Sequence, residues 1–485
     1  MQKKQKDTML DLWGYDYTTA SAVVSCLLLM AHLLIRLFKP PHTPSRSSSS
    51  NIQVEGDRSF LPLMGFETGY AVMVQTGVTT INFFPAKDVD FDMSKKKLKS
   101  RLKKICEANI WLVGTIIKDK KRHERLMCSF PNAVTDEDID AIFSTEAFDS
   151  VDEISSSTSY EMLAKRIKES GAICRSGYKV VNKPDRVLKV SLFPINGNKE
   201  FAFVFSISHL MADGHTYYKV LSMLADGSTI DSLQVQRVDR FNEVVEQTIG
   251  KADKEVLQSG YIVGNLVCRK LFGPPISTAS SNYIDPAKIA IAKQEEKESH
   301  SNDPNLFVST NDIITSAYGK AVDSGVLVMA LNLRGRTPEA SENLAGNYET
   351  LLWFDKHGIE TPAKIRQSLS RGPPFRRVSD KGPMTRWQEM TTTISLISSW
   401  IFPSFDADIH LWQKDGSPSS SVMLHLPLYV TVDGSPVPSL LVFKPCKGRL
   451  AVMSFYHANN NYHKRLIDGG EILGETVSAG MFASK

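Results

Sequence analysis

One short stretch, residues 201–214 (FAFVFSISHLMADG), constrains the fold more than any other part of this chain. A hydrophobic run rich in Phe and Val, which ends just before His209, predicts a buried strand. The Asp213-Gly214 pair that follows predicts a tight turn and then a helix through Leu224. We therefore expect His209 at the end of a strand, facing a cleft. The alternative is a partly buried histidine that binds Asp213 for structural reasons.

A histidine at such a position suits general-base catalysis. Its ordinary pKa lies nearer to neutrality than that of any other side chain. A positioned base that takes a proton from a hydroxyl or an amine typically accelerates a reaction about 10²–10⁴-fold. Asp213 can shape the loop and hold the imidazole indirectly, through a basic partner. The spacing alone is weak evidence, because the chain has 11 histidines and five Asp-Gly pairs.

Strand-like and helical segments alternate over the rest of the chain and predict a mixed α/β (α+β) protein. Strands are expected at 70–84, 185–194, 201–208, 327–333, 422–431, 439–443 and 450–456. Helices are expected at 94–108 and 309–324. Ser94 is a plausible N-cap for the first of these helices. A polar stretch with four prolines, 273–305, is interpreted as a crossover linker between domains at 51–272 and 306–485. Residues 256–272 predict either a packed helix or a second membrane contact.

The composition changes sharply near the N-terminus. Residues 18–38 are apolar as far as Arg36, over a length that can cross a bilayer as a helix. We predict an uncleaved transmembrane anchor there, after a tail at 1–17 and before a Pro/Ser-rich linker at 39–50. The alternative is a signal peptide. Arg36 and Lys39 lie close to the span, which predicts a single-pass membrane protein with a cytosolic body, for example in the endoplasmic reticulum.

Several kinds of site have no support in the sequence. The six cysteines include no Cys-x-x-Cys pair, and His209, Asp213 and His215 lack a distant His/Cys cluster, so no metal site is expected. Gly-x-Ser-x-Gly, P-loop and Gly-x-Gly-x-x-Gly patterns do not occur. The 57 basic and 53 acidic residues nearly balance, and the basic run at 95–104 is interpreted as a solvated helix face. No nucleic-acid partner is therefore expected.

Five segments, in the expected order, resemble the CoA-dependent acyltransferases that carry a His-x-x-x-Asp-Gly motif. This superfamily includes the BAHD enzymes, chloramphenicol acetyltransferase and the condensation domains of peptide synthetases. The segments are EANIWLVG (107–114), FAFVFSISHLMADG (201–214), STNDIITSA (309–317), NLRGRTPEASENLAGN (332–347) and SSWIFPSFDADIHLW (398–412). The resemblance covers most of residues 65–456. It implies two chloramphenicol acetyltransferase-like domains with an active-site channel at their interface.

The resemblance also implies roles for single residues. His209 would be the general base. Asp213 would point away from the substrate and pair with an arginine, either Arg334 or Arg336. Gly214 would allow the turn after Asp213.

The last of the five segments supplies two further candidates. Ser398 and Trp400 match the positions that donate hydrogen bonds to the oxyanion of the tetrahedral intermediate. The co-substrate would be an acyl-CoA, with no metal or prosthetic group, and the protein would be a monomer. The implied function is transfer of the acyl group to a hydroxyl or amine of a small-molecule or lipid acceptor.

The sequence also departs from the family pattern. Residues 408–412 (DIHLW) keep the Asp of the BAHD Asp-Phe-Gly-Trp-Gly motif but lose both glycines, which places membership of the plant branch in question. Ser208 stands where condensation domains carry a second histidine, which argues against a peptide-synthetase role. His215 is interpreted as a helix-start residue. The rival function is a non-catalytic, membrane-tethered protein that binds an acyl group, a lipid or a partner.

Overall fold

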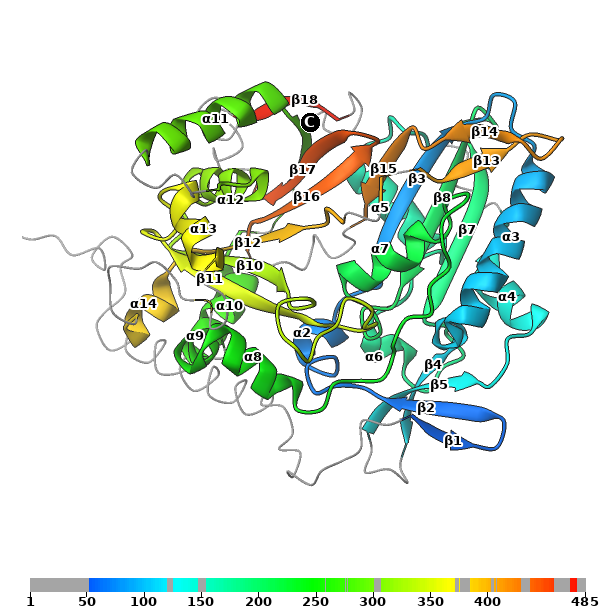
Figure 1. Cartoon of the computed structure of the whole chain (residues 1–485), viewed down its shortest axis with the longest axis horizontal. Helices are drawn as coiled ribbons and strands as arrows, with labels where there is room; N and C mark the ends of the chain where they lie inside the picture. Colours follow the sequence, from blue (N-terminus) through cyan, green and yellow to red (C-terminus); the bar gives the residue numbers. More distant parts are fainter. Residues whose placement is uncertain are drawn as a thin grey trace, which may run out of the picture.

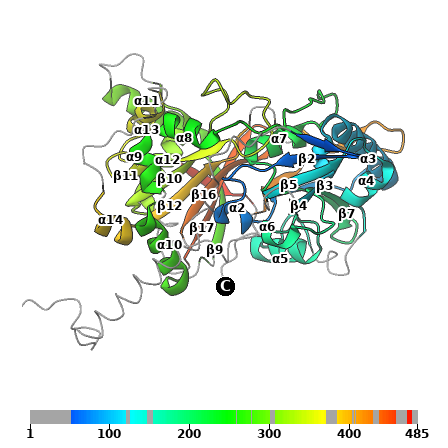
Figure 2. The same ribbon diagram turned by 90° about the horizontal axis from the view of Figure 1, so that it is seen from below.

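Two sheets, one built mainly from each half of the chain, form the centre of the molecule and lie side by side in the computed structural model (Figure 1). The structure describes residues 52–119, 125–146, 154–257, 259–274, 276, 278–300, 307–370, 375, 384–402, 405–406, 408–428, 437–457 and 472–477. Helices pack around both sheets (Figures 1 and 2). The predicted mixed α/β class is confirmed.

The first sheet has the strand order β15-β3-β8-β7-β6. These strands are β15 (Leu424–Pro427), β3 (Val78–Pro85), β8 (Glu200–Ile207), β7 (Leu188–Ile195) and β6 (Phe143–Ser144). A four-stranded sheet beside it contains β1 (Gln53–Glu55), β2 (Arg58–Pro62), β5 (Arg125–Pro131) and β4 (Thr115–Asp119). The helices of this half are α2 (Tyr70–Met73), α3 (Phe91–Ala108), η2 (Ile110–Val113), α4 (Asp136–Ile142), α5 (Tyr160–Glu169), α6 (Gly177–Val180) and α7 (Gly214–Ser222).

The second sheet has the strand order β11-β10-β12-β16-β17-β9-β18. These strands are β11 (Glu349–Asp355), β10 (Val326–Asn332), β12 (Ile394–Ser399), β16 (Ser439–Cys446), β17 (Arg449–Tyr456), β9 (Thr278–Ile284) and β18 (Leu473–Thr476). The helices of this half are α8 (Phe241–Ile249), α9 (Lys251–Leu257), α10 (Gly260–Phe272), α11 (Pro286–Ser299), α12 (Thr310–Ala321), α13 (Pro362–Ser370) and α14 (Arg386–Thr391). The stretch interpreted as a crossover linker, 273–305, thus contains a strand of this sheet, β9, and a helix, α11.

Part of the second half packs on the first half. β15 pairs antiparallel with β3, so a strand from late in the chain forms the edge of the early sheet. The hairpin of β13 (His410–Trp412) and β14 (Pro418–Ser421) lies beside α3 (Figure 1). Side chains from 405–422 belong to the same core cluster as those of β7 and β8. The two halves therefore share a core.

Two local predictions differ from the structure. The segment predicted as a strand at 70–84 divides into α2 and β3. Gly77 lies between them, and a Cβ there would be 2.7 Å from both Cys174 Cβ and the Ile207 carbonyl oxygen, so the chain passes where only glycine fits. Helix α3 is capped by Asp90, whose side chain accepts from the Met93 amide at 2.7 Å. Ser94, the predicted cap, instead binds the backbone of Trp412.

Most of the stretch 256–272 belongs to α10, which is a packed helix. Asn265, in α10, is buried and donates hydrogen bonds to the carbonyl oxygens of Glu389 (3.0 Å) and Thr392 (2.9 Å). These bonds attach α10 to α14, and the two helices lie side by side in Figure 2. The packed-helix alternative is therefore the one observed.

The predicted localisation needs correction. Within the described ranges, no helix is long and apolar enough to cross a membrane. Residues 18–38, to which the anchor was assigned, lie outside those ranges, together with the tail at 1–17 and the linker at 39–50. An apolar run of sufficient length permits a membrane span but does not require one. The prediction of a single-pass membrane protein with a cytosolic body is therefore withdrawn.

Candidate active site

His209 lies in the turn between β8 and α7 and is partly buried. The strand before it is almost entirely buried in the first sheet, which fixes the backbone up to Ile207. The Ser208 amide donates to the Val187 carbonyl at 2.7 Å, so the chain stays attached to the sheet as it turns. The imidazole thus projects from a rigid support.

The orientation of the imidazole is set by Asn347, from the loop between β10 and β11. Asn347 Nδ2 donates to the His209 carbonyl oxygen at 2.8 Å and to Glu67 Oε1 at 3.3 Å. The other end of the amide, Oδ1, therefore faces His209 Nδ1 at 3.0 Å. Because an amide oxygen only accepts, Nδ1 must carry the proton. The neutral imidazole then has its lone pair on Nε2, as a general base requires.

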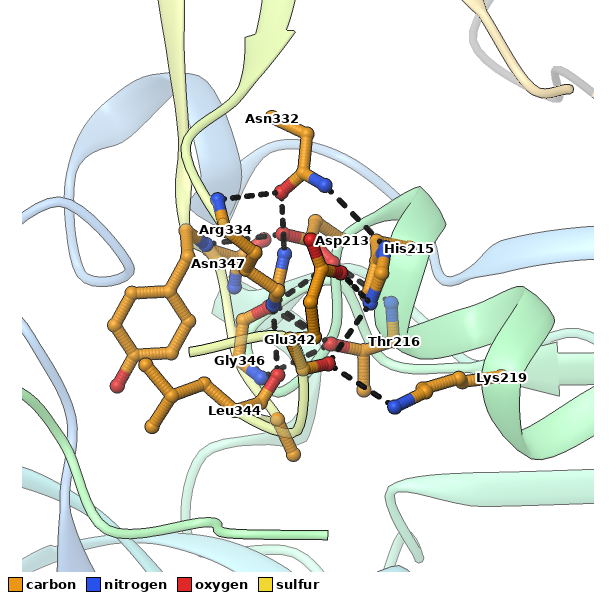
Figure 3. Close-up of polar contacts among 12 residues, drawn as sticks. Asp213, His215, Thr216, Lys219, Asn332, Arg334, Glu342, Leu344, Gly346 and Asn347 are labelled. Carbon is orange, nitrogen blue, oxygen red and sulfur yellow. Dashed lines mark hydrogen bonds and ion pairs between the residues drawn. The ribbon is translucent and has the colours of Figure 1, made fainter. Parts of the chain in front are cut away.

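Asp213 and Arg334 form a buried ion pair that joins the two halves of the chain (Figure 3). Arg334 Nη1 lies 2.7 Å from Asp213 Oδ2, and the two side chains are only 0% and 2% exposed. Asp213 also caps α7, because its Oδ1 accepts from the Thr216 amide at 2.9 Å. The Tyr348 amide donates to Oδ2 at 2.9 Å. The carboxylate is thus directed into this network and makes no hydrogen bond with His209.

The remaining donors of Arg334 hold the loop that carries Asn347. Arg334 donates to the carbonyl oxygens of Leu344 (2.7 Å) and Gly346 (2.8 Å) and to Asn332 Oδ1 (3.0 Å). The Thr216 hydroxyl bridges the Gly346 backbone and the same guanidinium. The ion pair therefore fixes the position of Asn347 relative to α7.

Burial and nearby charges shift several pKa values at this site. Burial lowers the pKa of His209 below its ordinary value of 6.5, which favours the neutral base at pH 7. Burial alone would raise the pKa of Asp213, but the charge and hydrogen bonds of Arg334 outweigh it and hold that pKa low. Burial, with a contribution from the Asp213 charge, raises the pKa of Glu349 to about 8.

His215 lies in the first turn of α7, where the sequence placed it. Asn332 Nδ2 donates to its Nδ1 at 3.3 Å, and its Nε2 lies 3.2 Å from the Glu342 carbonyl oxygen. Burial and the Arg334 charge lower the pKa of His215. This imidazole therefore connects α7 to the loop after β10 (Figure 3).

The other predicted residues lie in different surroundings. Arg336 does not reach Asp213, and its guanidinium lies over the Phe375 ring, 5.6 Å from the centroid. Gly214 opens α7 without a positive φ, so the turn itself does not require glycine. A Cβ at Gly214 would lie 3.4 Å from Phe402 and 3.8 Å from Trp400, which places these rings against the start of α7.

Ser398 and Trp400 lie at the end of β12. Ser398 pairs with Leu441 of β16 and is partly buried. The partly buried Trp400 packs on the core clusters of both sheets, with its ring 6.0 Å from Tyr218 and 6.5 Å from Tyr217. Trp400 thus lies beside α7, whereas no hydrogen bond connects either residue with His209 in the described part of the chain.

Four residues of this network had no predicted role: Asn347, Asn332, Thr216 and Glu67. Asn347 is the last residue of the 332–347 segment, so the sequence marked its position, but it did not show that Asn347 would contact His209. Glu67 is 0% exposed, and no pattern in the sequence connects it with His209. A pocket of about 160 Å³ is lined by 62–66, Arg125 and 237–242, but not by Glu67. His209 is not among its lining residues. Among the described residues, no group of three His, Cys, Asp or Glu side chains could hold a metal ion.

Searches against protein-family models and against curated proteins found no match. Among solved structures, the chain is similar to trichothecene 15-O-acetyltransferase (TRI3) from Fusarium sporotrichioides, at 11% identity and a TM-score of 0.56 over 88% of this chain and 98% of that one. It is also similar to vinorine synthase, at 14% identity and a TM-score of 0.49 over 90% and 97%. A third similar structure is TRI101 from F. graminearum with coenzyme A and T-2 mycotoxin, at 13% identity and a TM-score of 0.49 over 84% and 97%.

The first of these likenesses shows that the chain shares the fold of this acetyltransferase over 88% of its length. The resemblance stated from the sequence is thereby confirmed for the fold. At this level of identity the likeness concerns the fold alone, so the chemistry has to be argued from the residues of the site.

Proposed function

We propose that this protein is an acyltransferase in which His209 is the general base. An acceptor hydroxyl or amine gives its proton to Nε2 as its oxygen or nitrogen attacks the thioester carbonyl of an acyl-CoA. The tetrahedral intermediate then collapses, the carbon–sulfur bond breaks, and the CoA thiolate takes the proton from the imidazolium. The products are the acylated acceptor and free CoA.

The observation that carries this proposal is the hydrogen bond between His209 Nδ1 and Asn347 Oδ1, at 3.0 Å. This bond assigns the proton to Nδ1 and leaves Nε2 unprotonated. The lowered pKa keeps the ring neutral near pH 7, so the base is ready in most molecules. A histidine with only a structural role needs no free nitrogen, and no described residue binds Nε2.

Asp213 and Arg334 support the reaction without touching the substrate. Their buried ion pair holds α7 and the Asn347 loop together, so it keeps His209 and Asn347 at hydrogen-bonding distance. The rings of Phe402 and Trp400 lie at ordinary van der Waals distance from the Cβ position of Gly214, so they pack against the start of α7. Ser398 and Trp400 are the proposed oxyanion donors, on the strength of the family resemblance and of the contact between Trp400 and this helix.

The donor and acceptor classes follow from the resemblance and from the shared fold. The name of the Fusarium protein states acetyl transfer to an oxygen, and this supports a hydroxyl acceptor over an amine. The acceptor would be a small molecule or a lipid, and acyl-CoA would be the only co-substrate, with no metal. The protein would act as a monomer.

The test is release of CoA by the full-length protein, measured with a panel of acyl-CoAs and mixed alcohols and amines. Wild type should release CoA at a rate that depends on the acceptor. His209→Ala should lower kcat/KM by about 10²-fold or more, because the base is lost. His300→Ala is the matched control, since it removes a partly exposed imidazole next to α11.

The proposal fails if wild type binds acyl-CoA but His209→Ala releases CoA at the same rate as wild type. Binding without any turnover in wild type would favour the rival function, a protein that binds an acyl group or a partner.

A further inference from the structure

Glu67 is a buried carboxylate to which the proposed mechanism gives no part. It lies in the loop before α2 and is 0% exposed. Its Oε2 accepts from the Met64 amide at 2.9 Å and from Arg237 Nε at 2.9 Å. Its Oε1 accepts from the Asn347 amide at 3.2 Å and from Asn347 Nδ2 at 3.3 Å, and Arg237 Nη2 lies 2.8 Å from it. All of its partners are donors.

Arg237 is held as firmly as the carboxylate. Its Nη1 donates to the carbonyl oxygens of Ala345 (2.6 Å) and Val235 (3.0 Å), and its side chain is 2% exposed. Gly346 gives the guanidinium its space, because a Cβ there would be 2.6 Å from Nη1, and its φ is +138°. Arg237 therefore fixes Glu67 and is also hydrogen-bonded to the backbone close to Asn347.

We propose that Glu67 is a positioning residue for the reaction, acting through Asn347 on His209. Asn347 Nδ2 donates both to Glu67 Oε1 at 3.3 Å and to the His209 carbonyl oxygen at 2.8 Å, and these two acceptors together prevent the amide from turning over, so that Oδ1 stays against the Nδ1 of His209. Glu67 and Arg237 thus select the imidazole tautomer that has a free Nε2. The catalytic meaning of this inference rests on the proposed function, but the tautomer itself does not.

The chemistry of the site favours a carboxylate at position 67. A glutamine would place its NH₂ group against two or more of the surrounding N–H donors, and one end of the amide would have to lose its partners. A buried ion pair is costly to desolvate, and a well-packed apolar pair often stabilises a protein equally well. Stability alone therefore does not explain why Glu67 and Arg237 are charged, whereas a carboxylate that accepts from both the backbone and the side chain of Asn347 adds to the bond that orients this amide on His209.

The experiment measures the tautomer of His209 directly, in full-length protein labelled with ¹⁵N-histidine. The signals of His209 are identified by their absence in His209→Gln. Nitrogen shifts distinguish a protonated ring nitrogen from one with a lone pair, and no substrate is needed. Wild type should show the proton on Nδ1 alone. Glu67→Gln and Asn347→Ala should both show a mixture of the two tautomers.

Two further variants separate positioning from folding. In Glu67→Met/Arg237→Met both charges are replaced by apolar side chains of similar length, so no unpaired charge remains if Glu67→Gln fails to fold. Glu200→Gln is the matched control. Its carboxylate also accepts several hydrogen bonds, from Ser156 and Asn196, but it lies at the start of β8, the end away from His209. The double variant should lose the single tautomer, and the control should keep it.

Kinetics provide the second measurement. Glu67→Gln should lower kcat by about 10- to 100-fold, because only part of the molecules hold the reactive tautomer and the base is less well aligned. KM for the acyl donor should change less than about twofold, since Glu67 is fully buried and offers no surface for the donor to contact. A variant that binds the donor poorly because its structure is damaged would raise KM instead.

The inference is overturned if folded Glu67→Gln and the double variant both keep the wild-type tautomer. It is also overturned if they lose the tautomer with no effect on kcat in an active enzyme. If wild type transfers no acyl group at all while the tautomer still depends on Glu67, the proposed function is wrong and the structural effect of Glu67 on His209 stands.

Discussion

Two histidines in this molecule are held in the same way, and only one of them has a free nitrogen. His425 Nδ1 lies 2.7 Å from Asn82 Oδ1, just as His209 Nδ1 lies 3.0 Å from Asn347 Oδ1. The Nε2 of His425, however, binds the Tyr218 hydroxyl at 2.9 Å, and its side chain is fully buried. His425 therefore serves the structure, and the difference between the two residues lies in what meets Nε2.

The lowered pKa of His209 predicts the pH dependence of the reaction. The base must be neutral, so kcat/KM should rise with pH and reach its plateau after a midpoint below 6.5. Initial rates between pH 4.5 and 8 with a constant acyl donor would measure the midpoint. A midpoint at or above 6.5 would contradict the desolvated environment inferred for the imidazole.

Arg334 and Arg336 make a matched pair for testing the ion pair. Arg334→Met leaves the Asp213 carboxylate buried without its partner and should lower the free energy of unfolding by about 3–5 kcal/mol. Among the described residues, Arg336→Met removes a contact with the Phe375 ring and an attraction to the exposed Glu342, and it should cost about 1 kcal/mol or less. Urea denaturation of both variants measures the difference. An equal decrease in the free energy of unfolding in both variants would show that the Asp213–Arg334 pair does not contribute more to stability than the Arg336 contact.

At this scale the sequence identified the residues that stand in a short motif. His209 and Asp213 share one turn, and Arg334 belongs to a segment that resembles the family, so each could be proposed before the structure was known. Glu67 and Arg237 could not, because their contact depends on how distant loops pack, and no spacing in the sequence records it.

His425, a residue of β15, forms hydrogen bonds with Tyr218 and Asn82 that help to hold this strand on the first sheet. Tyr218→Phe removes the hydroxyl that donates to His425 Nε2 and leaves a buried acceptor without a partner. The free energy of unfolding should fall by about 1–3 kcal/mol, as urea denaturation would show. Tyr178→Phe, at a residue that is 58% exposed, is the control and should cost less, because at an exposed position water can replace a lost partner. A loss that is the same in both variants would contradict a role for this network.

The secondary structure that the sequence predicted best is the part with strong periodicity. The strands expected at 185–194 and 201–208 appear as β7 and β8, with ends shifted by a few residues. The expected strand at 70–84 was too long, because β-branched residues favour a strand but do not show where a glycine lets the chain turn. The strand in 273–305 was missed because its sequence, TASSNYI, is polar and lacks a clear alternation.

The stability of the whole molecule should show two opposing dependences on pH. Burial lowers the pKa of His425 from 6.5 to about 3, so the unfolded chain binds more protons there and stability falls as the pH drops below 6.5. Burial raises the pKa of Glu349 from 4.5 to about 8, so the folded chain binds more protons there and stability falls as the pH rises between these values. Between pH 5 and 6.5 the two effects largely cancel.

The variant Glu349→Gln should separate these two effects. Without the carboxyl group, the free energy of unfolding should decrease by up to about 1.4 kcal/mol for each unit that the pH drops from 6.5 toward 5, owing to His425, with a further loss from His209. The same variant should be more stable than wild type at pH 8. Urea denaturation at pH 5, 6.5 and 8 measures both. An unchanged pH dependence would show that Glu349 is ionised at neutral pH.

For the whole molecule, alternating strands and helices were enough to predict a mixed α/β fold, and five segments in order pointed to the fold of an acyltransferase. The packing of 405–428 on the first half was not predictable. A division of the chain into consecutive domains assigns this segment to the second domain, whereas it packs on the first. That packing depends on the unpaired edge of β3, which the sequence does not reveal.

The pairing of β15 with β3 has a consequence for synthesis on the ribosome. The edge of β3 at Thr80–Phe83 finds its partner only when residues 424–427 have been made. At about 5–20 residues per second, the interval after β8 has emerged lasts roughly tens of seconds. During that interval the nascent sheet has an open edge, which neighbouring chains can join. The open edge of β3 therefore has to be protected until β15 has been made. This is a requirement for producing the protein, and it is separate from the stability of the finished fold.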